Sequence, residues 1–134
     1  MKANELMIGD FVRIKDVTVR VKEISARIER CCFEDKYGSY WAFGSYWPKE
    51  VEPVPLTKEM LFANGFNKYV SCRGKTYYGY TTDHKILFEI MEWVEGNLET
   101  AVGGRYIELK YVHELQHLLR LAGLGKVADE FKVK

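Results

Sequence analysis

Long apolar runs are missing from this sequence, and no stretch approaches the roughly 20 uninterrupted apolar residues that a membrane-spanning helix needs. The first ten residues, MKANELMIGD, also lack the hydrophobic stretch of a secretory signal. An excess of one charge sign is missing too, because 20 Lys and Arg stand against 19 Asp and Glu. Broad electrostatic binding to nucleic acid requires clustered positive charge. We therefore expect a cytoplasmic protein with no membrane partner and no general affinity for nucleic acid.

Cysteine pairs of the kind that bind zinc or exchange disulfides are also missing. The three cysteines are Cys31, Cys32 and Cys72, and no C-x-x-C spacing occurs. Neighbours in sequence rarely bridge each other, because so short a ring strains the disulfide geometry. We expect free, mostly buried thiols in a reducing compartment. No dinucleotide fingerprint, nucleophile elbow or calcium loop is present, so the sequence predicts no cofactor.

What the sequence does contain is enough apolar material for a folded core: 47% of its 134 residues are apolar and 29% are charged. Residues 1–55 are typical of short strands. In VTVRV (17–21) the valines alternate with polar residues, which predicts a half-buried strand. Further strands are expected at 11–14, 26–34 and 40–43 and within 47–56. Five short strands with tight turns predict an SH3-like small β-barrel or curled sheet over residues 1–55.

Residues 56–134 show a different pattern, which predicts a helix, an antiparallel meander and a second helix. Thr57 is a good N-cap and Asn64-Gly65 a good stop, so the first helix is expected at 57–64. The second helix is expected at 111–122 and stops at Gly123. Strands are expected at 67–72, 76–82, 85–94, 98–102 and 105–109. The fold class is therefore α+β, with the first unit packed on the second; whether the halves fold independently is left open.

The segment HELQH (113–117) matches the H-E-x-x-H pattern of zinc peptidases. Two imidazoles four residues apart lie on one helix face and could bind one Zn²⁺. No histidine follows His117 to act as a third ligand, however, and the apolar stripe of the helix lies opposite both rings. We therefore expect His113 and His117 to point into solvent and expect no metal site. A minimal zinc peptidase, with these histidines as ligands and Glu114 as base, is the alternative.

Aromatic residues concentrate between positions 37 and 47, where GSYW occurs twice. Such rings can fill a small core, grip a peptide or stack single-stranded bases. The segment has almost no Lys or Arg, which favours a protein or peptide partner over nucleic acid. The expected contact residues are Tyr37, Tyr40, Trp41, Tyr46 and Trp47. Single-strand binding through this segment is a further alternative, and Tyr77, Tyr78 and Tyr80 form a second aromatic group.

Two weaker patterns have structural explanations. Gly74-Lys75-Thr76 resembles the end of a phosphate loop, but Tyr69 stands where that loop needs glycine, so we predict a hairpin turn. An acidic run follows, and it is expected to form a solvated strand edge. Its members are Glu89, Glu92, Glu95 and Glu99.

Three stretches taken in order resemble a family of small proteins found in anaerobic gut bacteria and in their prophages and mobile elements. The stretches are MKANELMIGDFV, VEPVPLTKEMLFANGF and YVHELQHLLRLAGL. The resemblance implies a cytoplasmic protein encoded near phage or integrative-element genes. It implies no catalytic residue, because the family offers none.

These observations together predict a non-enzymatic binding or accessory protein that contacts a protein or peptide partner. The sequence leaves open which partner it contacts and whether the chain forms a homodimer.

Overall fold

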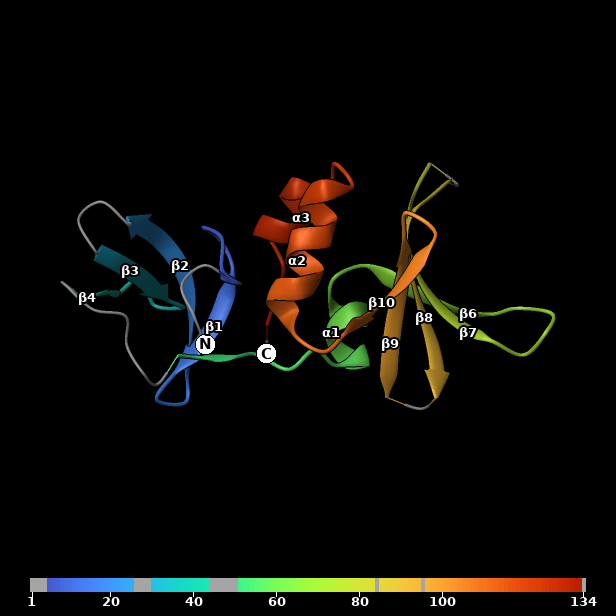
Figure 1. Ribbon diagram of the computed structural model, residues 1–134, viewed down its shortest axis with the longest axis horizontal. Helices are drawn as coiled ribbons and strands as arrows, with labels where there is room; N and C mark the ends of the chain where they lie inside the picture. Colours follow the sequence, from blue (N-terminus) through green and yellow to red (C-terminus); the bar gives the residue numbers. More distant parts are fainter. Residues whose placement is uncertain (1–4, 26–29, 44–50, 84, 95, 134) are drawn as a thin grey trace. The chain divides into compact units, whose positions relative to one another are not determined.

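The computed structural model describes residues 5–25, 30–43, 51–83, 85–94 and 96–133 (Figure 1). The chain divides into two compact units, Met1–Val54 and Pro55–Lys132. Each unit contains a five-stranded antiparallel sheet, and the described residues also form three short helices. The α+β class predicted from the sequence is confirmed. No helix in the described part of the chain has the length and apolar character needed to cross a membrane.

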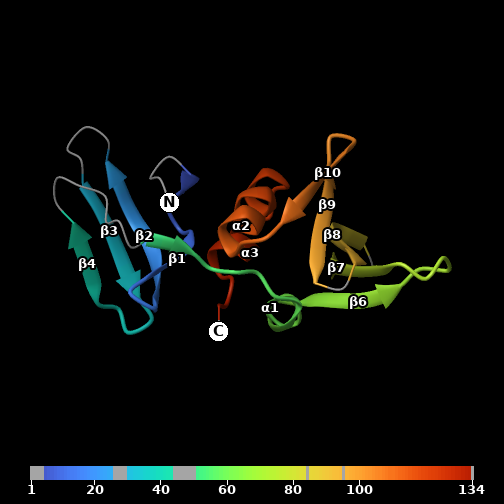
Figure 2. The same cartoon turned by 60° about the horizontal axis from the view of Figure 1, so that its bottom comes forward.

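The first sheet has the strand order β4-β3-β2-β1-β5 (Figure 2). Its strands are β1 (Phe11–Ile14), β2 (Val17–Ser25), β3 (Arg30–Asp35), β4 (Tyr40–Phe43) and β5 (Val51–Pro53). All five lie inside or overlap the segments predicted to be strands. The described strands form an open sheet with β4 and β5 at its edges rather than a closed barrel.

The core of the first unit follows from the period of two residues along each strand. Side chains alternate between the faces of a strand, so every second apolar residue of β1 and β2 faces the same side. The buried cluster consists of Leu6, Val12, Ile14, Val19, Val21, Cys31, Phe33 and Val51. A two-residue turn joins β1 to β2, because Ile14 pairs with Val17. Both turn residues, Lys15 and Asp16, have positive φ angles of 48° and 66°.

The second sheet is a meander with the order β10-β9-β8-β7-β6. Its strands are β6 (Phe66–Val70), β7 (Thr76–Thr82), β8 (Lys85–Val94), β9 (Asn97–Val102) and β10 (Arg105–Leu109). Each strand pairs antiparallel with the next, as predicted. The predicted glycine turn is also present, since Gly74 has φ 80°. Gly103 and Gly104, with φ angles of 57° and 80°, lie in the turn between β9 and β10.

Two of the three helices match the predicted ones. In α1 (Lys58–Ala63) the Thr57 Oγ1 accepts a hydrogen bond from the Met60 N–H at 3.3 Å. The second helix is α2 (Val112–Leu121), and Gly123 follows it with φ 81°. The third, α3 (Gly125–Asp129), was not predicted. It has five residues and no side-chain N-cap, so neither apolar periodicity nor capping residues mark it in the sequence.

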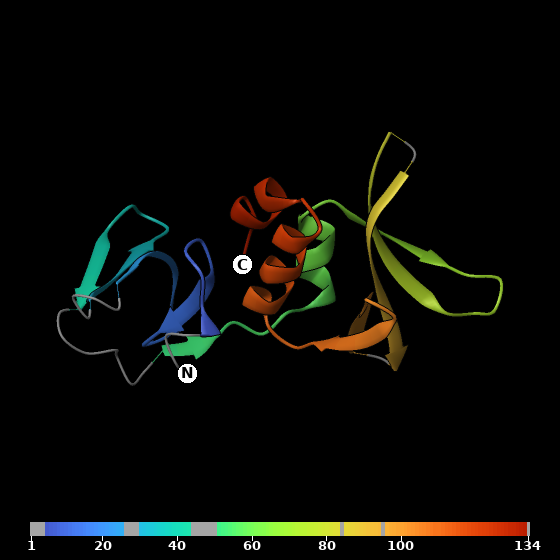
Figure 3. The same cartoon turned by 45° about the horizontal axis from the view of Figure 1, so that its top comes forward.

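The two faces of the second sheet differ. Residues that pair directly across antiparallel strands point to the same face. Tyr78 therefore shares a face with Ile90, its register partner, and both are fully buried. Phe62 of α1 packs edge-on against Tyr78 at 5.6 Å between ring centres, so α1 lies on this face. Figure 3 shows α1 and α2 on the same side of the sheet. We call the opposite side, over which no described helix of this unit lies, the open face.

Candidate protein-binding surface

The H-E-x-x-H segment lies in the first turn and centre of α2, and its glutamate has a structural role. Glu114 is the third residue of the helix, and its Oε1 accepts hydrogen bonds from the N–H groups of Tyr111 (2.9 Å) and Lys110 (3.0 Å). A glutamate at this position satisfies N–H groups that have no partner inside the helix. The carboxylate that the peptidase alternative needs as its base is therefore the cap of α2.

The prediction that both imidazoles face solvent is wrong for His113. This side chain is buried, with only 7% of its surface exposed, and its ring stacks on Tyr111 at 5.9 Å. His117 is half-buried, and its ring meets that of His113 edge-on at 5.6 Å. Among the described residues, no group of three or more His, Cys, Asp or Glu side chains could hold a metal ion.

The C-terminal helix explains why the polar side of α2 is not open to water. Gln116 is fully buried, and its Nε2 donates to the Ala128 carbonyl of α3 at 2.9 Å. Arg120 forms an ion pair with Asp129 at 3.4 Å. The residues after Gly123 thus form a helix that packs on α2 rather than an exposed tail.

The three cysteines differ in their exposure to solvent. Cys31 and Cys32 are buried in the first unit, Cys72 is exposed, and all three are free. Burial, with a smaller contribution from neighbouring Cys32, raises the pKa of the Cys31 thiol. A thiol with a raised pKa is less often the reactive thiolate.

The aromatic segment 37–47 falls partly on described residues. Tyr37 lies in the turn between β3 and β4 and is 81% exposed, with the Lys36 Nζ 5.1 Å from its ring centre. Asp35 Oδ1 holds this turn by accepting from the N–H groups of Tyr37 and Ser39, both at 2.9 Å. Tyr40 begins β4 and is also exposed.

The other three predicted contact residues are Trp41, Tyr46 and Trp47. Trp41 pairs with Phe33 through the backbone of β4. Tyr46 and Trp47 lie outside the described residues.

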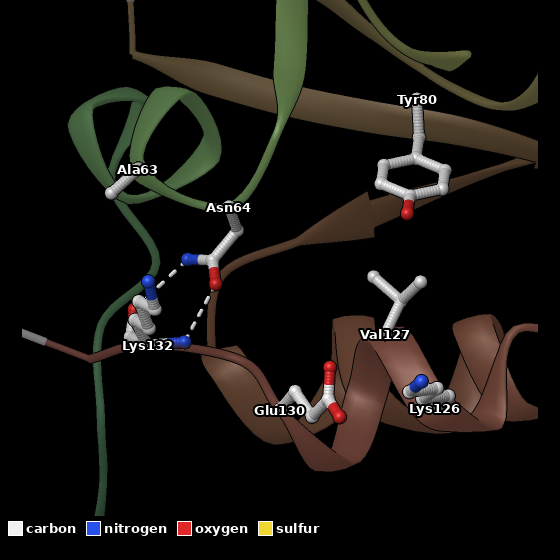
Figure 4. Close-up of a pocket in the computed structure, with 7 residues that line it drawn as sticks. All are labelled: Ala63, Asn64, Tyr80, Lys126, Val127, Glu130 and Lys132. Carbon is white, nitrogen blue, oxygen red and sulfur yellow. Dashed lines mark hydrogen bonds between the residues drawn. The ribbon is translucent and has the colours of Figure 1, made fainter. Parts of the chain in front are cut away.

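A pocket of about 380 Å³ lies in the second unit between the end of α1, strand β7 and the C-terminal segment (Figure 4). It is lined by Ala63, Asn64, Tyr80, Lys126, Val127, Glu130 and Lys132. Asn64 is occupied in holding this segment: its Nδ2 donates to the Met60 (2.7 Å) and Lys132 (2.9 Å) carbonyls, and its Oδ1 accepts from the Lys132 N–H (2.6 Å). The lining contains no nucleophile paired with a base, so it does not resemble a hydrolytic site.

The open face of the second sheet carries a row of large side chains. Tyr69 of β6 pairs with Tyr77 of β7, and Tyr77 pairs with Met91 of β8. The two tyrosine rings are stacked, with their centres 5.2 Å apart and their planes 13° apart. The Tyr69 ring lies over Gly79, where an added Cβ would come within 3.4 Å of the ring. A glycine here leaves room for the close approach of this ring.

A bulge in β8 adds Trp93 to this row. The register of β8 and β9 shifts between Glu92 and Val94, so Trp93 is the extra residue. Bulges of this kind re-aim a side chain. The Trp93 ring lies edge-on to Tyr106 of β10, 6.0 Å between centres, and the Lys75 Nζ lies 4.2 Å from its centre. Trp93 is 47% exposed and Tyr106 61%.

We call Tyr69, Tyr77, Met91, Trp93 and Tyr106 the open-face patch, and of these Met91 is buried, with 6% of its surface exposed. Its members come from four strands, and the sequence did not predict it. The sequence indicated only part of it, the tyrosine group 77–80, and Tyr78 of that group is buried in the core. The alternation along β6, β7 and β8 was the available signal, since it places Tyr69, Tyr77 and Met91 on one face once the meander register is known.

The acidic run separates into two environments. Glu92, expected in a solvated edge, accepts instead from the Tyr78 hydroxyl (3.0 Å) and the Gly96 N–H (2.9 Å). The hydrogen bond from the Gly96 N–H, and to a smaller extent the one from the Tyr78 hydroxyl, lowers the pKa of Glu92. Glu89 lies on the open face and accepts from the Tyr69 hydroxyl. Burial and this bond raise the pKa of Tyr69 to about 12.

Comparison with known proteins gives no further guide to the site: no family model, no curated protein and no solved structure matches this chain.

Proposed function

We propose that this chain is a non-enzymatic binding module that contacts a protein partner through the open-face patch. The observation that carries this proposal is the contact between Trp93 and Tyr106, two exposed rings on a sheet face that no described helix of the unit covers. Large aromatic side chains are enriched at protein interfaces, because they bury much area at a low cost in conformational entropy. Tyr69, which is 36% exposed, adds a further ring to this face. Exposed apolar side chains gathered on one face typically mark an interaction site.

The first unit supports a second contact surface. Its strand order places β5 beside β1, and this order supports an SH3-like module, a class that binds peptides on aromatic surfaces. Tyr37 and Tyr40 are exposed aromatic residues of this unit. The resemblance to proteins of phages and mobile elements would make the module an accessory protein of such an element.

Photo-crosslinking tests the main proposal. A benzoylphenylalanine placed at Tyr106 in the native host should form one discrete adduct with another protein. The matched control position is Leu121, which is 81% exposed at the end of α2 and outside the patch. No adduct is expected there.

The captured protein, once purified, should bind the native chain directly. Its affinity by calorimetry should fall at least about 10-fold for the Trp93→Ala, Tyr106→Ala double variant, as for an interface hot spot. The Leu121→Ala variant should bind like the native chain. Equal capture at both positions, or an adduct with twice the mass of the chain, would contradict a partner protein on this face.

A further inference from the structure

We infer that the partner segment received by the open face is basic, rich in lysine or arginine. This inference rests on the function proposed above and specifies the chemistry of its partner. Two observations carry it: the carboxylates that share the face with the patch, and a cation already held on one of its rings.

The carboxylates continue the row in which Tyr69, Tyr77 and Met91 lie. Met91 pairs with Glu99 of β9, and Glu99 pairs directly with Glu108 of β10. Like charges directly opposite each other across two strands are destabilising. Lys110 lies 3.9 Å from Glu108, and none of the described basic side chains pairs with Glu99. A cationic partner placed between these two carboxylates would relieve the repulsion.

The aromatic end of the row accepts cations by a different mechanism. The face of an aromatic ring attracts an ammonium or guanidinium group. Lys75 shows this within the chain, since its Nζ lies 4.2 Å from the centre of the Trp93 ring. The exposed rings of Tyr69 and Tyr106 offer the same chemistry to a partner.

The face therefore suits a segment that alternates basic and apolar or small side chains. Its ammonium or guanidinium groups would reach Glu99 and Glu108, and its stems would lie over the rings, as lysine and arginine stems do on apolar surfaces. A nucleic-acid strand could stack on the rings, but its phosphates would meet three carboxylates, the third being Glu89. The chemistry thus favours a basic polypeptide over nucleic acid.

Fluorescence anisotropy with labelled 12-residue peptides tests this inference. The probes alternate serine with lysine, glutamine or glutamate, and the full chain is the titrant. The lysine peptide should bind at least about 10-fold more tightly than the glutamine peptide, and its affinity should fall with salt. The glutamate peptide should bind more weakly than the glutamine peptide.

The Glu99→Gln, Glu108→Gln double variant should lose about 10-fold in affinity for the lysine peptide and little for the glutamine peptide. It should unfold no more readily than the native chain, because the substitutions remove a repulsion, so the loss cannot arise from misfolding. The control is Glu59→Gln with Glu130→Gln, which makes the same charge change at exposed positions on α1 and after α3. This control variant should bind the lysine peptide more tightly than the glutamine peptide, by the same factor as the native chain.

Equal binding of all three peptides, or an unchanged affinity in the Glu99, Glu108 variant, would overturn the inference. If the partner captured at Tyr106 still depends on Trp93 in that case, the proposed function stands and only its basic chemistry fails. If neither peptides nor a captured partner depends on Trp93, both proposals fail. Tighter binding of a labelled oligothymidine than of the lysine peptide would assign the face to nucleic acid instead.

Discussion

The Tyr78 hydroxyl donates a hydrogen bond to Glu92 Oε1 across 3.0 Å, from strand β7 to strand β8. Tyr78 is fully buried beneath α1, and the other oxygen of Glu92 holds the Gly96 N–H in the turn before β9. One carboxylate thus connects the core of the second unit to the turn that sets the register of β8 and β9. Burial, and to a smaller extent the hydrogen bond to Glu92, raises the pKa of Tyr78 to about 12.

The raised pKa predicts a stability that declines in strong alkali. The ordinary tyrosine pKa is about 10. The folded state holds the phenol proton more tightly, so the stabilisation is complete below about pH 10 and is lost as the pH rises from 10 to about 12. Urea unfolding followed by circular dichroism should therefore show a steep loss of stability over this interval.

The Tyr78→Phe variant should reduce that slope and cost about 1 kcal/mol at pH 7, the value of one hydrogen bond. Tyr37→Phe, which removes the hydroxyl of an exposed tyrosine, is the control and should behave like the native chain. A native slope retained in the Tyr78 variant would show that the phenol is not the group responsible.

Asn64 joins the end of α1 to the C-terminal segment by hydrogen bonds to both the N–H and the carbonyl of Lys132. The Asn64→Ala variant leaves these backbone groups and the Met60 carbonyl without their partner, which we expect to cost about 2 kcal/mol. Hydrogen exchange should increase in residues 125–133. Asn67→Ala, in the exposed part of β6, is the control; similar exchange in the two variants would argue against the role of Asn64.

The strands were predictable from the sequence because they obey local rules. Valines alternate in β2, and the glycines at 74, 103 and 104 stand where the chain needs positive φ. The core position of Tyr78 was not predictable from its neighbours Tyr77 and Tyr80, since it depends on which face α1 covers. The burial of Gln116 was missed for a related reason: a helical stripe identifies one packed face, and here α3 packs on another, where Gln116 donates to the Ala128 carbonyl.

The open-face patch could not be predicted from the sequence for a different reason. Tyr69, Trp93 and Tyr106 come together only through pairing across the sheet and through the bulge at Trp93. A one-residue change of register moves side chains to the other face. No alternation pattern read along a single strand therefore places these three rings together.

The turn between β1 and β2 predicts a stabilising substitution. Two-residue hairpin turns with positive φ at both positions favour Asn-Gly, whereas this chain has Lys15 and Asp16 in that conformation. The Lys15→Asn, Asp16→Gly double variant should stabilise the first hairpin by about 1 kcal/mol. Hydrogen exchange of residues 11–25 should slow accordingly. The opposite order, Lys15→Gly with Asp16→Asn, controls for composition, and an equal effect of both orders would contradict the assignment of the turn.

Glu114 allows the capping and peptidase interpretations of the H-E-x-x-H segment to be separated. As the cap of α2 it accepts from two backbone N–H groups, so Glu114→Ala should destabilise the second unit by about 1 kcal/mol. Glu114→Gln retains a side-chain oxygen and should restore most of that loss. A catalytic base with no capping role would behave differently, because Glu114→Ala would then abolish hydrolysis while leaving stability and bound zinc unchanged. The measurements are urea unfolding of both variants and metal analysis of protein purified without a nickel column. Stoichiometric zinc that disappears in His117→Ala would contradict the capping role as the full account of this segment.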